Sequence, residues 1–426
     1  MNWQERDKKN VWHPFTQMKI APEPIHIERA EGAHLYASDG RIFIDAIASW
    51  WVNIHGHGNR VIAEKIAAQA LTLEHVLFAG FTHTPAVELA ENLLAVLPPH
   101  FDKVFYSDNG STSVEVALKM ALQYFFNTGQ KHKKRIIAFE DAYHGDTFGA
   151  MSAGGKSLFN APFQELLFDV AHLPIPNAEN TEGVLRAFEA IAKEGNVAAF
   201  IFEPLVQGSA GMLMYEAKYL DELLKIAKAH HIICIADEVM TGFGRTGKMF
   251  ATNHLTETAD IICLSKGITG GFLPLGVTVC TAAIFDAFYD DALTKAFFHG
   301  HSYTANPICC AAAVASMEIL RGAECQANIA RIVGQHADFV QKIKNNPFVK
   351  NVRQTGTILA IELATTEGTS YTNTIKARAM QFFLDNGVLI RPLGNIIYLL
   401  PPYCISAADL IYIYGVVERA LVFLNE

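Results

Sequence analysis

The fold of this chain is decided by two stretches of its sequence, 232-IICIADE-238 and 260-DIICLSKG-267. Each is a short and almost continuous apolar run, which is typical of a strand buried on both faces of a parallel sheet. The first run ends in Asp237 and Glu238, and the second ends in Lys266. Because ligands bind beyond the carboxyl ends of the strands in open α/β sheets, we expect these polar side chains to mark a functional site.

Similar apolar runs alternate with segments of helical period along most of the chain. This alternation predicts an α/β fold whose large, mostly parallel sheet is covered by helices on both faces. The expected strands are Val104–Ser107, Arg135–Phe139, Ala198–Glu203, Ile232–Asp237, Ile261–Ser265 and Gly276–Cys280. The expected helices among them are Ser113–Phe126, Glu182–Ala192 and Ala217–Ala229.

The pattern changes near residues 321–323, and the rest of the chain indicates a smaller α+β unit. After a first helix, its expected elements are a strand around Thr357–Glu362, a helix at Thr374–Asn386 and short strands at Gly387–Arg391 and Ile396–Leu399. A chain of 426 residues is long for a single core. Because chain ends often meet, we predict a large domain of residues 49–322 and a small domain formed by residues 1–48 and 323–426.

The composition argues against several classes of function. The formal net charge is −9, with 43 acidic and 34 basic residues, whereas a nucleic-acid-binding protein usually carries a basic stripe. The short basic segment 131–135 leads into an apolar strand and is expected to be a solvated loop. Seven scattered cysteines favour a reducing compartment. The polar N-terminus lacks a signal-peptide core, and no apolar run reaches the roughly 18 residues of a membrane span, so we expect a cytoplasmic protein.

A lysine at the end of a buried strand has two interpretations. The simpler one is a side chain that reaches solvent, because a buried ammonium costs free energy unless it is paired or neutralised. The functional one is an amine that forms an imine with an aldehyde cofactor. Pyridoxal 5′-phosphate (PLP) is such a cofactor, and it draws electrons while a carboxylate keeps its pyridine nitrogen protonated. The pair therefore predicts a PLP site in which Lys266 meets the aldehyde and Asp237 meets the ring nitrogen.

Two further segments are suited to complete such a site. The segment 106-YSDNGSTS-113 follows a strand and opens a helix. Free N–H groups at a helix N-terminus suit a phosphate, so Gly110 and Ser111 are candidate ligands, although the same residues would also make an ordinary N-cap. In the segment 142-AYHGDT-147, the ring of Tyr143 is expected either to stack on the pyridine or to pack in the core.

Two other motifs carry weaker signals. The segment 242-GFGRTG-247 matches the pattern of dinucleotide-binding loops. Such a loop should open a helix and be followed by a strand that ends in an acid, and neither is evident, so a nicotinamide oxidoreductase is a weak alternative. The pairs His55/His57 and His299/His301 have no Cys or Glu partners at ligand spacing. We therefore expect no metal site and interpret them as loop histidines near an anionic cofactor.

The residues around the two strand ends resemble those of a known family. The stretches 236-ADEV-239, 241-TGFGRTG-247 and 265-SKG-267 are similar to the class III aminotransferases, which are PLP-dependent transferases of fold type I. The agreement spans essentially the whole chain. The resemblance implies an enzyme that uses PLP to transfer amino groups, and it implies the two-domain fold type I architecture.

The chain also contains more specific motifs, namely 12-WHPFTQ-17, 49-SWW-51, 55-HGHG-58, 143-YHGDT-147, 391-RPLG-394 and 398-YLLPPY-403. Together these motifs resemble one branch of this family. The resemblance implies conversion of 8-amino-7-oxononanoate to 7,8-diaminononanoate in biotin biosynthesis, with S-adenosylmethionine as the amino donor.

The resemblance also implies roles for the matching residues around the cofactor. Lys266 is the Schiff-base lysine and proton carrier, and Asp237 contacts the pyridine nitrogen. Gly110 and Ser111 hold the phosphate, and Tyr143 lies beside the ring and the substrate.

Other matches imply substrate contacts and a second subunit. Phe15 and Trp50 line the substrate pocket, and the guanidinium of Arg391 binds the carboxylate of the keto substrate. Gly300 is implied to contact substrate across a dimer interface, and the adjacent residues 301–302 are implied to contact the cofactor phosphate there. The resemblance therefore implies a symmetric homodimer with two composite sites.

Three positions depart from the pattern of that branch. Phe15 stands where members that use S-adenosylmethionine commonly carry Tyr, so the donor is either S-adenosylmethionine or lysine. His301 and Ser302 stand in place of Pro and Thr, and Ser302 keeps the hydroxyl. Two alternatives stay open, namely another class III aminotransferase acting on an ω-amino acid or diamine, and a non-catalytic PLP-binding protein of the same fold.

Overall fold

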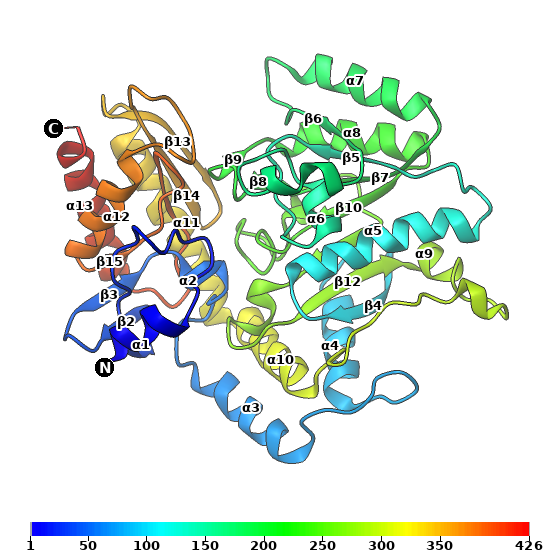
Figure 1. Cartoon of the computed structure of the whole chain (residues 1–426), viewed down its shortest axis with the longest axis horizontal. Coiled ribbons are helices and arrows are strands. Elements are labelled where there is room, and N and C mark those ends of the chain that lie inside the picture. Colours follow the sequence, from blue (N-terminus) through cyan, green and yellow to red (C-terminus); the bar gives the residue numbers. More distant parts are fainter. Residues whose placement is uncertain (1, 426) are drawn as a thin grey trace.

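The computed structural model describes residues 2–425, which form a larger and a smaller part (Figure 1). The larger part surrounds a seven-stranded sheet, and the smaller part contains both ends of the chain. Within residues 2–425, every helix is too short or too polar to span a lipid bilayer.

The sheet of the larger part is parallel except at one strand. In spatial order its strands are β4 (Phe101–Ser107), β12 (Gly276–Thr281), β11 (Ile261–Leu264), β10 (Ile233–Asp237), β7 (Val197–Phe202), β5 (Arg135–Phe139) and β6 (Val170–Leu173). β12 runs antiparallel to both of its neighbours, and the pairs among β11, β10, β7, β5 and β6 are parallel. β7 and β10 are buried along their whole length, which explains their continuous apolar sequences.

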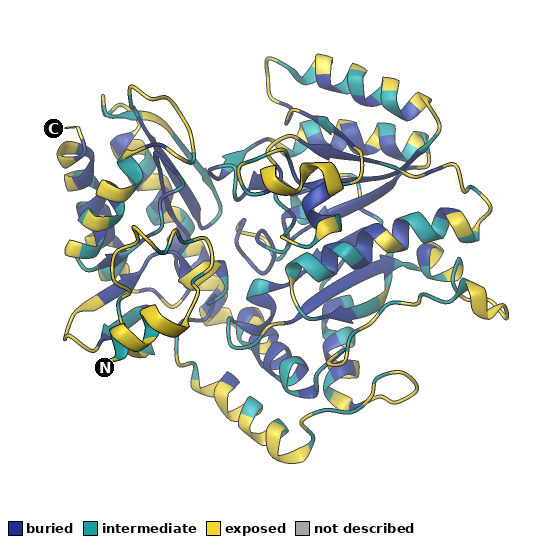
Figure 2. Ribbon diagram, in the orientation of Figure 1, coloured by how far each residue is buried: buried dark blue, intermediate teal, exposed yellow. Residues whose placement is uncertain are grey.

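Helices cover both faces of this sheet, whose strands are buried in Figure 2. The helices of the larger part are α3 (Arg60–Thr72), α4 (Thr84–Leu94), α5 (Gly110–Asn127), α6 (Phe148–Ala153), α7 (Thr181–Lys193), α8 (Ala217–Ala229), α9 (Ala282–Asp286) and α10 (Pro307–Arg321). α5, α6 and α9 contribute to the core on one face, and α4, α7, α8 and α10 contribute to the core on the other. Successive strand residues such as Ile235 and Ala236 therefore enter different cores.

Short elements connect these helices and strands. They are η1 (Ala161–Leu166), β8 (Val206–Gln207), β9 (Leu213–Met214), η2 (Ala251–His254), η3 (Lys266–Thr269) and η4 (Leu293–Lys295). β8 and β9 form a two-stranded antiparallel sheet. Only Ser265 separates β11 from η3.

The smaller part is built from both ends of the chain. One sheet contains β1 (Ile27–Glu31), β2 (His34–Ala37), β3 (Ile42–Asp45) and β15 (Val388–Leu389), and a second contains β13 (Val349–Thr355), β14 (Ile358–Leu363) and β16 (Ile396–Leu399). Its helices are α1 (Trp3–Asn10), α2 (Ala48–Trp51), α11 (Ala323–Ile343), α12 (Ile375–Asp385) and α13 (Ala407–Phe423). β15 pairs in parallel with β3, so the two ends of the chain share a sheet.

The predicted fold class, an α/β fold with a mostly parallel sheet and a smaller α+β part, is confirmed. All six expected strands of the large sheet are present, and α8 has the expected bounds Ala217–Ala229. Among the elements that the sequence analysis did not predict are β6, β13 and α13. The domain boundaries at residues 48/49 and 322/323 stay a prediction.

Candidate active site

A cavity of about 670 Å³ opens where several strands of the large sheet end. Its walls come from segments that are far apart in the sequence, because parallel strands bring their carboxyl ends to one edge. The lining includes Trp51, Asn109, Gly110, Ser111, Tyr143, His144, Asp146, Thr147, Glu203, Asp237, Lys266, Phe272 and Leu273. The structure therefore brings together five residues that the sequence assigned to the cofactor site: Gly110, Ser111, Tyr143, Asp237 and Lys266.

Lys266 is the second residue after β11 and begins η3, and its backbone is unusual. Its φ of 46° lies in the left-handed region, where a residue other than glycine carries strain. The ammonium nitrogen lies 4.6 Å from the ring centre of Trp51 and has no ion pair among the described residues. Desolvation lowers the pKa of Lys266 to about 8, although the carboxylates of Asp237 and Glu203 oppose this shift. A larger fraction of this lysine is therefore a neutral nucleophile near neutral pH than for a lysine in water.

Asp237 ends β10 and is held in place by two contacts. Its side chain is buried, the Val239 N–H donates to Oδ1 (3.0 Å), and Nδ1 of His144 lies 2.6 Å from Oδ2. Burial alone would lower the pKa of His144, but the hydrogen bond and the charge of Asp237 raise it. The imidazole therefore favours a positive charge beside the carboxyl group of Asp237, and its own Nε2 is buried without a hydrogen-bond partner among the described residues.

Glu203 is a further carboxylate of this cavity that sequence reasoning did not assign. It directly follows β7, and it accepts hydrogen bonds from the backbone N–H groups of Tyr143 (3.1 Å) and Gly208 (3.0 Å). Burial raises the pKa of Glu203 to about 7, with a further contribution from Asp237 that the charge of His144 opposes. Glu203 therefore ties two loops of the cavity wall together. Its position after a strand, like that of Asp237, is the signal that could have found it.

The N-terminus of α5 also forms part of the cavity wall. The side chain of Asn109 caps the helix by accepting the Thr112 N–H (2.9 Å), which leaves the first N–H groups of the helix, at Gly110 and Ser111, at the cavity. A Cβ at residue 110 would lie 2.6 Å from Cγ1 of Val239, so this close approach requires glycine. The hydroxyl of Ser111 lies 2.7 Å from that of Thr147. This corner offers helix N–H groups and hydroxyls to an anion.

These residue types fit the groups of PLP. The cavity provides an amine, a buried carboxylate with a protonatable imidazole behind it, an anion-binding helix N-terminus and the aromatic side chain of Tyr143. Burial, together with the neighbouring carboxylate of Asp146, raises the pKa of Tyr143, so its phenol stays protonated and can donate a hydrogen bond. The residues that would hold PLP are Lys266, Asp237, Gly110, Ser111 and Tyr143.

Three of the residues predicted to bind substrate, Phe15, Trp50 and Arg391, lie outside the lining of this cavity and close to one another. Arg391 and Trp50 line a second cavity of about 790 Å³ under the N-terminal segment. The guanidinium carbon of Arg391 lies 4.6 Å from the ring centre of Trp50, and the ring of Phe15 lies 5.5 Å from that of Trp50. Trp51, rather than Trp50, lines the cavity of Lys266.

Three predicted residues lie away from the cavity within this single chain. Gly300 and Ser302 are exposed, and the backbone N–H of Tyr303 donates to Nδ1 of His301 (3.3 Å). Their predicted roles, which need a second subunit, stay predictions.

The weaker motifs have structural explanations. The segment Gly242–Gly247 forms turns and opens no helix, and its Arg245 is buried and donates to the carbonyl of Pro401 (2.8 Å). His55 lies 3.0 Å from the hydroxyl of Ser316 and His57 pairs with Asp45, and neither lines the cavity, so their interpretation as histidines near the cofactor stays a prediction. Within residues 2–425 no cluster of three or more His, Cys, Asp or Glu side chains is arranged to hold a metal ion.

Comparisons with known proteins agree with this site. The family described as Aminotransferase class-III matches residues 16–421. The adenosylmethionine-8-amino-7-oxononanoate aminotransferase of Synechococcus elongatus is 50% identical over 97% of this chain and 98% of its own length. The crystal structure of the enzyme of that name from Methanocaldococcus jannaschii is 36% identical, with a TM-score of 0.93 over 98% of each chain.

A solved omega transaminase is also similar. The structure from Pseudomonas jessenii in complex with PMP is 26% identical, with a TM-score of 0.94 over 100% of this chain and 98% of its own. The fold alone therefore does not choose between substrates. The match to the family over most of the chain, together with the lysine, carboxylate and helix N-terminus that meet in one cavity, shows that this chain belongs to the class III aminotransferases.

Proposed function

We propose that this chain transfers an amino group from S-adenosylmethionine to 8-amino-7-oxononanoate and so makes the 7,8-diaminononanoate of biotin biosynthesis. The observation that carries the proposal is the 50% identity over 97% of the chain to a relative named for this reaction. The pairing of Arg391 with Trp50 beside the cavity of Lys266 supports it, because the acceptor has a carboxylate at the far end of an apolar chain.

PLP, when bound, supplies an aldehyde for the amine and a ring that withdraws electrons from the carbon being deprotonated. Lys266 removes and returns a proton at the substrate carbon that bears the nitrogen, the general acid–base role for which a pKa of about 8 suits it. Asp237, supported by His144, presents a fixed negative charge to the ring nitrogen. The phenol of Tyr143 stays protonated and orients the reacting groups as a hydrogen-bond donor.

The acceptor is bound at both ends. Its carboxylate pairs with Arg391, and its apolar chain lies along Trp50 and Phe15 toward Lys266. The donor then occupies the same space in the other half of the reaction, so these aromatic walls must serve two unlike molecules in turn. Flat rings suit this task because they stack on an adenine and pack against methylene groups equally well.

Lysine is a second candidate donor, and Phe15 is the observation that favours it. Its ring is half exposed beside Trp50 and offers no hydroxyl to the donor. Mixing the PLP-loaded enzyme separately with S-adenosylmethionine and with lysine tests this choice, since only a donor converts the yellow enzyme to its pyridoxamine form. If neither converts it and 4-aminobutyrate or ornithine does, the enzyme is an ω-amino acid transaminase instead.

A homodimer with composite sites is part of the proposal. Gly300, His301 and Ser302 lie away from the cavity of their own chain, and an exposed loop that carries a hydroxyl suits the phosphate of a neighbouring site. Light scattering of the purified protein tests the assembly, and a monomer that is fully active would contradict it.

An Arg391→Ala variant is expected to raise the KM for 8-amino-7-oxononanoate about ten- to hundredfold, because it removes a charge-assisted hydrogen bond. The donor half-reaction should change far less, since the donor does not need this contact for its amino end to reach Lys266. Steady-state kinetics with the acceptor varied measure the effect. Arg378, an exposed arginine of α12, provides the matched control, and an unchanged KM in Arg391→Ala would refute the assigned carboxylate site.

Binding of PLP to the apoenzyme is expected to accelerate as the pH rises through about 8. Only the neutral amine attacks an aldehyde, and the pKa of Lys266 is lowered to about 8, so the reactive form is present above this pH and is lost below it. Stopped-flow absorbance at a series of pH values gives the midpoint. A midpoint near ~10.4, the value of a lysine in water, would mean that the cavity does not desolvate Lys266.

A further inference from the structure

The segment that carries the two cavity tryptophans has a strained backbone. Within α2, three of the four residues have φ in the left-handed region, namely Ala48 (50°), Ser49 (60°) and Trp51 (68°). None of these is glycine, so each conformation costs free energy and persists only if the surroundings impose it. This strained turn lies between the cofactor cavity and the second cavity. We therefore looked for a residue whose contacts stabilise its backbone.

Asp45 is that residue. It ends β3, its side chain is fully buried, and both of its carboxylate oxygens point at the strained turn. The N–H of Ile47 donates to Oδ1 (3.1 Å), and the N–H of Ser49 donates to Oδ2 (2.6 Å). Nε2 of His57 lies 2.8 Å from the same Oδ2 and completes its set of partners. We call Asp45 and His57 the carboxylate clamp.

Backbone hydrogen bonds hold His57 in place, so its imidazole can hold the carboxylate of Asp45 in place. Its backbone N–H donates to the carbonyl of Gly32 (2.8 Å), and its own carbonyl accepts from the Gly32 N–H (3.0 Å). The clamp is therefore anchored to the β1–β2 turn, well outside the cavity lining.

The turn that the clamp holds aims two tryptophans in different directions. The ring of Trp51 faces the nitrogen of Lys266 (4.6 Å), and its Nε1–H donates to the hydroxyl of Tyr398 (3.0 Å). The ring of Trp50 lies under the guanidinium of Arg391 (4.6 Å from its centre). On a regular helix, the side chains of two successive residues would diverge by about 100°. The backbone of α2 is not regular, so helix geometry alone does not determine the directions of Trp50 and Trp51.

We propose that Asp45 and His57 are positioning residues for the acceptor, acting by holding Trp50 where it orients the guanidinium of Arg391. The inference rests on the proposed function, since it assigns to the clamp the placement of the carboxylate site. A purely structural clamp would support the fold but would have no particular effect on the acceptor. The two roles differ in how an Asp45 variant combines with an Arg391 variant.

A double-mutant cycle tests the proposal. Asp45→Asn keeps the size of the side chain, loses its charge, and is expected to raise the KM for 8-amino-7-oxononanoate about tenfold, as a small misplacement of a binding group does. In an Arg391→Ala background, Asp45→Asn is expected to raise the KM little further, because both variants disrupt the same carboxylate-binding contact. Independent, multiplying effects of the two variants, or an unchanged KM in Asp45→Asn, would overturn the proposal.

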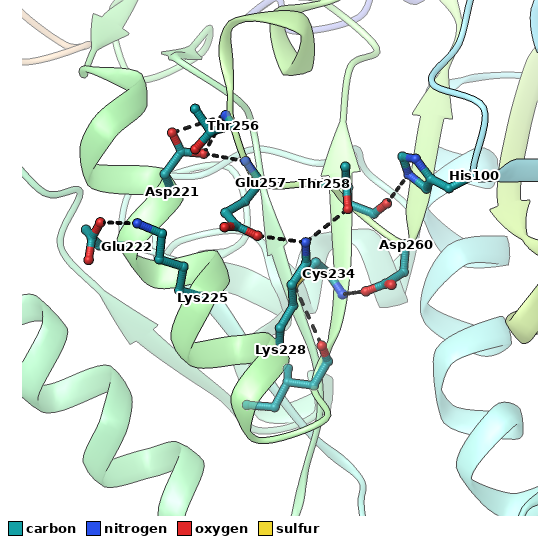
Figure 3. A network of polar contacts seen from close by, with 12 residues as sticks. His100, Asp221, Glu222, Lys225, Lys228, Cys234, Thr256, Glu257, Thr258 and Asp260 are labelled. Carbon is teal, nitrogen blue, oxygen red and sulfur yellow. Dashed lines mark hydrogen bonds and ion pairs between the residues drawn. The ribbon is translucent and has the colours of Figure 1, made fainter.

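Asp221 provides the matched control. Like Asp45 it is a buried aspartate that accepts two backbone N–H groups, here from Thr256 (3.0 Å) and Glu257 (2.9 Å), which lie far along the chain, as Figure 3 shows. It lies on α8 and does not line either cavity. Asp221→Asn is expected to lower the unfolding temperature without changing the KM for the acceptor. A rise in KM equal to that of Asp45→Asn would show that any lost buried carboxylate has this effect, and would overturn the proposal.

Two further experiments support this test. The first does not depend on turnover, and the second does not require Asp45→Asn to fold. Hydrogen–deuterium exchange of the apoenzyme should speed up at the amides of Ile47 and Ser49 in Asp45→Asn and stay unchanged there in Asp221→Asn. If Asp45→Asn fails to fold, His57→Gln and His57→Leu replace it. Gln keeps an N–H donor for Asp45 and should keep a normal KM, while Leu should raise it, and equal behaviour of the two would overturn the proposal.

The failure of the inference is distinguishable from that of the proposed function. A wild-type enzyme that does not aminate 8-amino-7-oxononanoate would refute the proposed function. A wild-type enzyme that does so, with an Asp45→Asn variant of unchanged KM and unchanged amide exchange, would refute the clamp alone.

Discussion

A Lys266→Ala variant is expected to lose amino transfer by at least about 10⁴-fold, because it removes both the amine that holds PLP and the general base. Its fold should persist, since Lys266 makes no ion pair within the described residues and carries a strained φ of 46°. The rest of the cavity should still bind PLP without a covalent link through the N-terminus of α5 and Asp237. Single-turnover kinetics and borohydride treatment followed by mass spectrometry measure the two losses.

Lys228 supplies the control for this prediction. It lies on α8, where it pairs with Glu257 (2.9 Å) in the network of Figure 3, away from the cavity. Lys228→Ala should keep both the activity and the borohydride-stable link. A Lys266→Ala variant that turned over at the rate of Lys228→Ala would remove the chemical basis of the assignment.

An Asp237→Asn variant is expected to lower the rate of the half-reaction with either substrate about 10³-fold, because the fixed charge that faces the ring nitrogen is lost. The variant also leaves His144 buried beside a neutral amide, 2.6 Å from the position of Oδ2, so the positive charge on the imidazole is no longer stabilised. The KM values should change less than kcat, since neither substrate is expected to contact Asp237. Stopped-flow absorbance of the holoenzyme after full PLP saturation separates this effect from weakened cofactor binding.

The control for Asp237 lies at the opposite edge of the sheet. Asp260 precedes β11, is partly buried, and accepts the backbone N–H of Cys234 (2.8 Å) at the start of β10 (Figure 3). Asp260→Asn should affect stability and leave the half-reaction rate nearly unchanged. Equal losses in the two variants would show that any buried charge in this sheet matters, and would argue against a contact between Asp237 and the ring.

The sequence predicts the large sheet well because its strands are buried on both faces and read as apolar runs. β10 and β11 could be identified within one or two residues for this reason. The direction of β12 could not, since an antiparallel strand buried on both faces has the same apolar pattern as a parallel one. β13 was missed because it is only partly buried, and its sequence Val349–Thr355 contains Lys, Asn, Arg and Gln.

The sequence predicts those site residues that were sought as polar side chains at the ends of apolar strands. It misses the residue at a strand end where this search was not made. Asp237 and Lys266 stood out because a charge at the end of an apolar run needs an explanation. Glu203 ends such a run as well, but its contacts are with backbone N–H groups of Tyr143 and Gly208, which no sequence pattern reveals. The division of the tryptophan pair between two cavities depends on the strained turn, and positive φ values at non-glycine residues leave no mark in the sequence.

The central claim is that the pyridoxamine form of this enzyme transfers its amino group to 8-amino-7-oxononanoate. The most direct measurement converts the purified enzyme to its pyridoxamine form, removes the donor, and mixes it with 8-amino-7-oxononanoate while absorbance and product are recorded. The account predicts return of the yellow PLP form with one 7,8-diaminononanoate formed for each active site. Failure to return with this acceptor, together with rapid return on addition of a different keto acid or aldehyde, would contradict it.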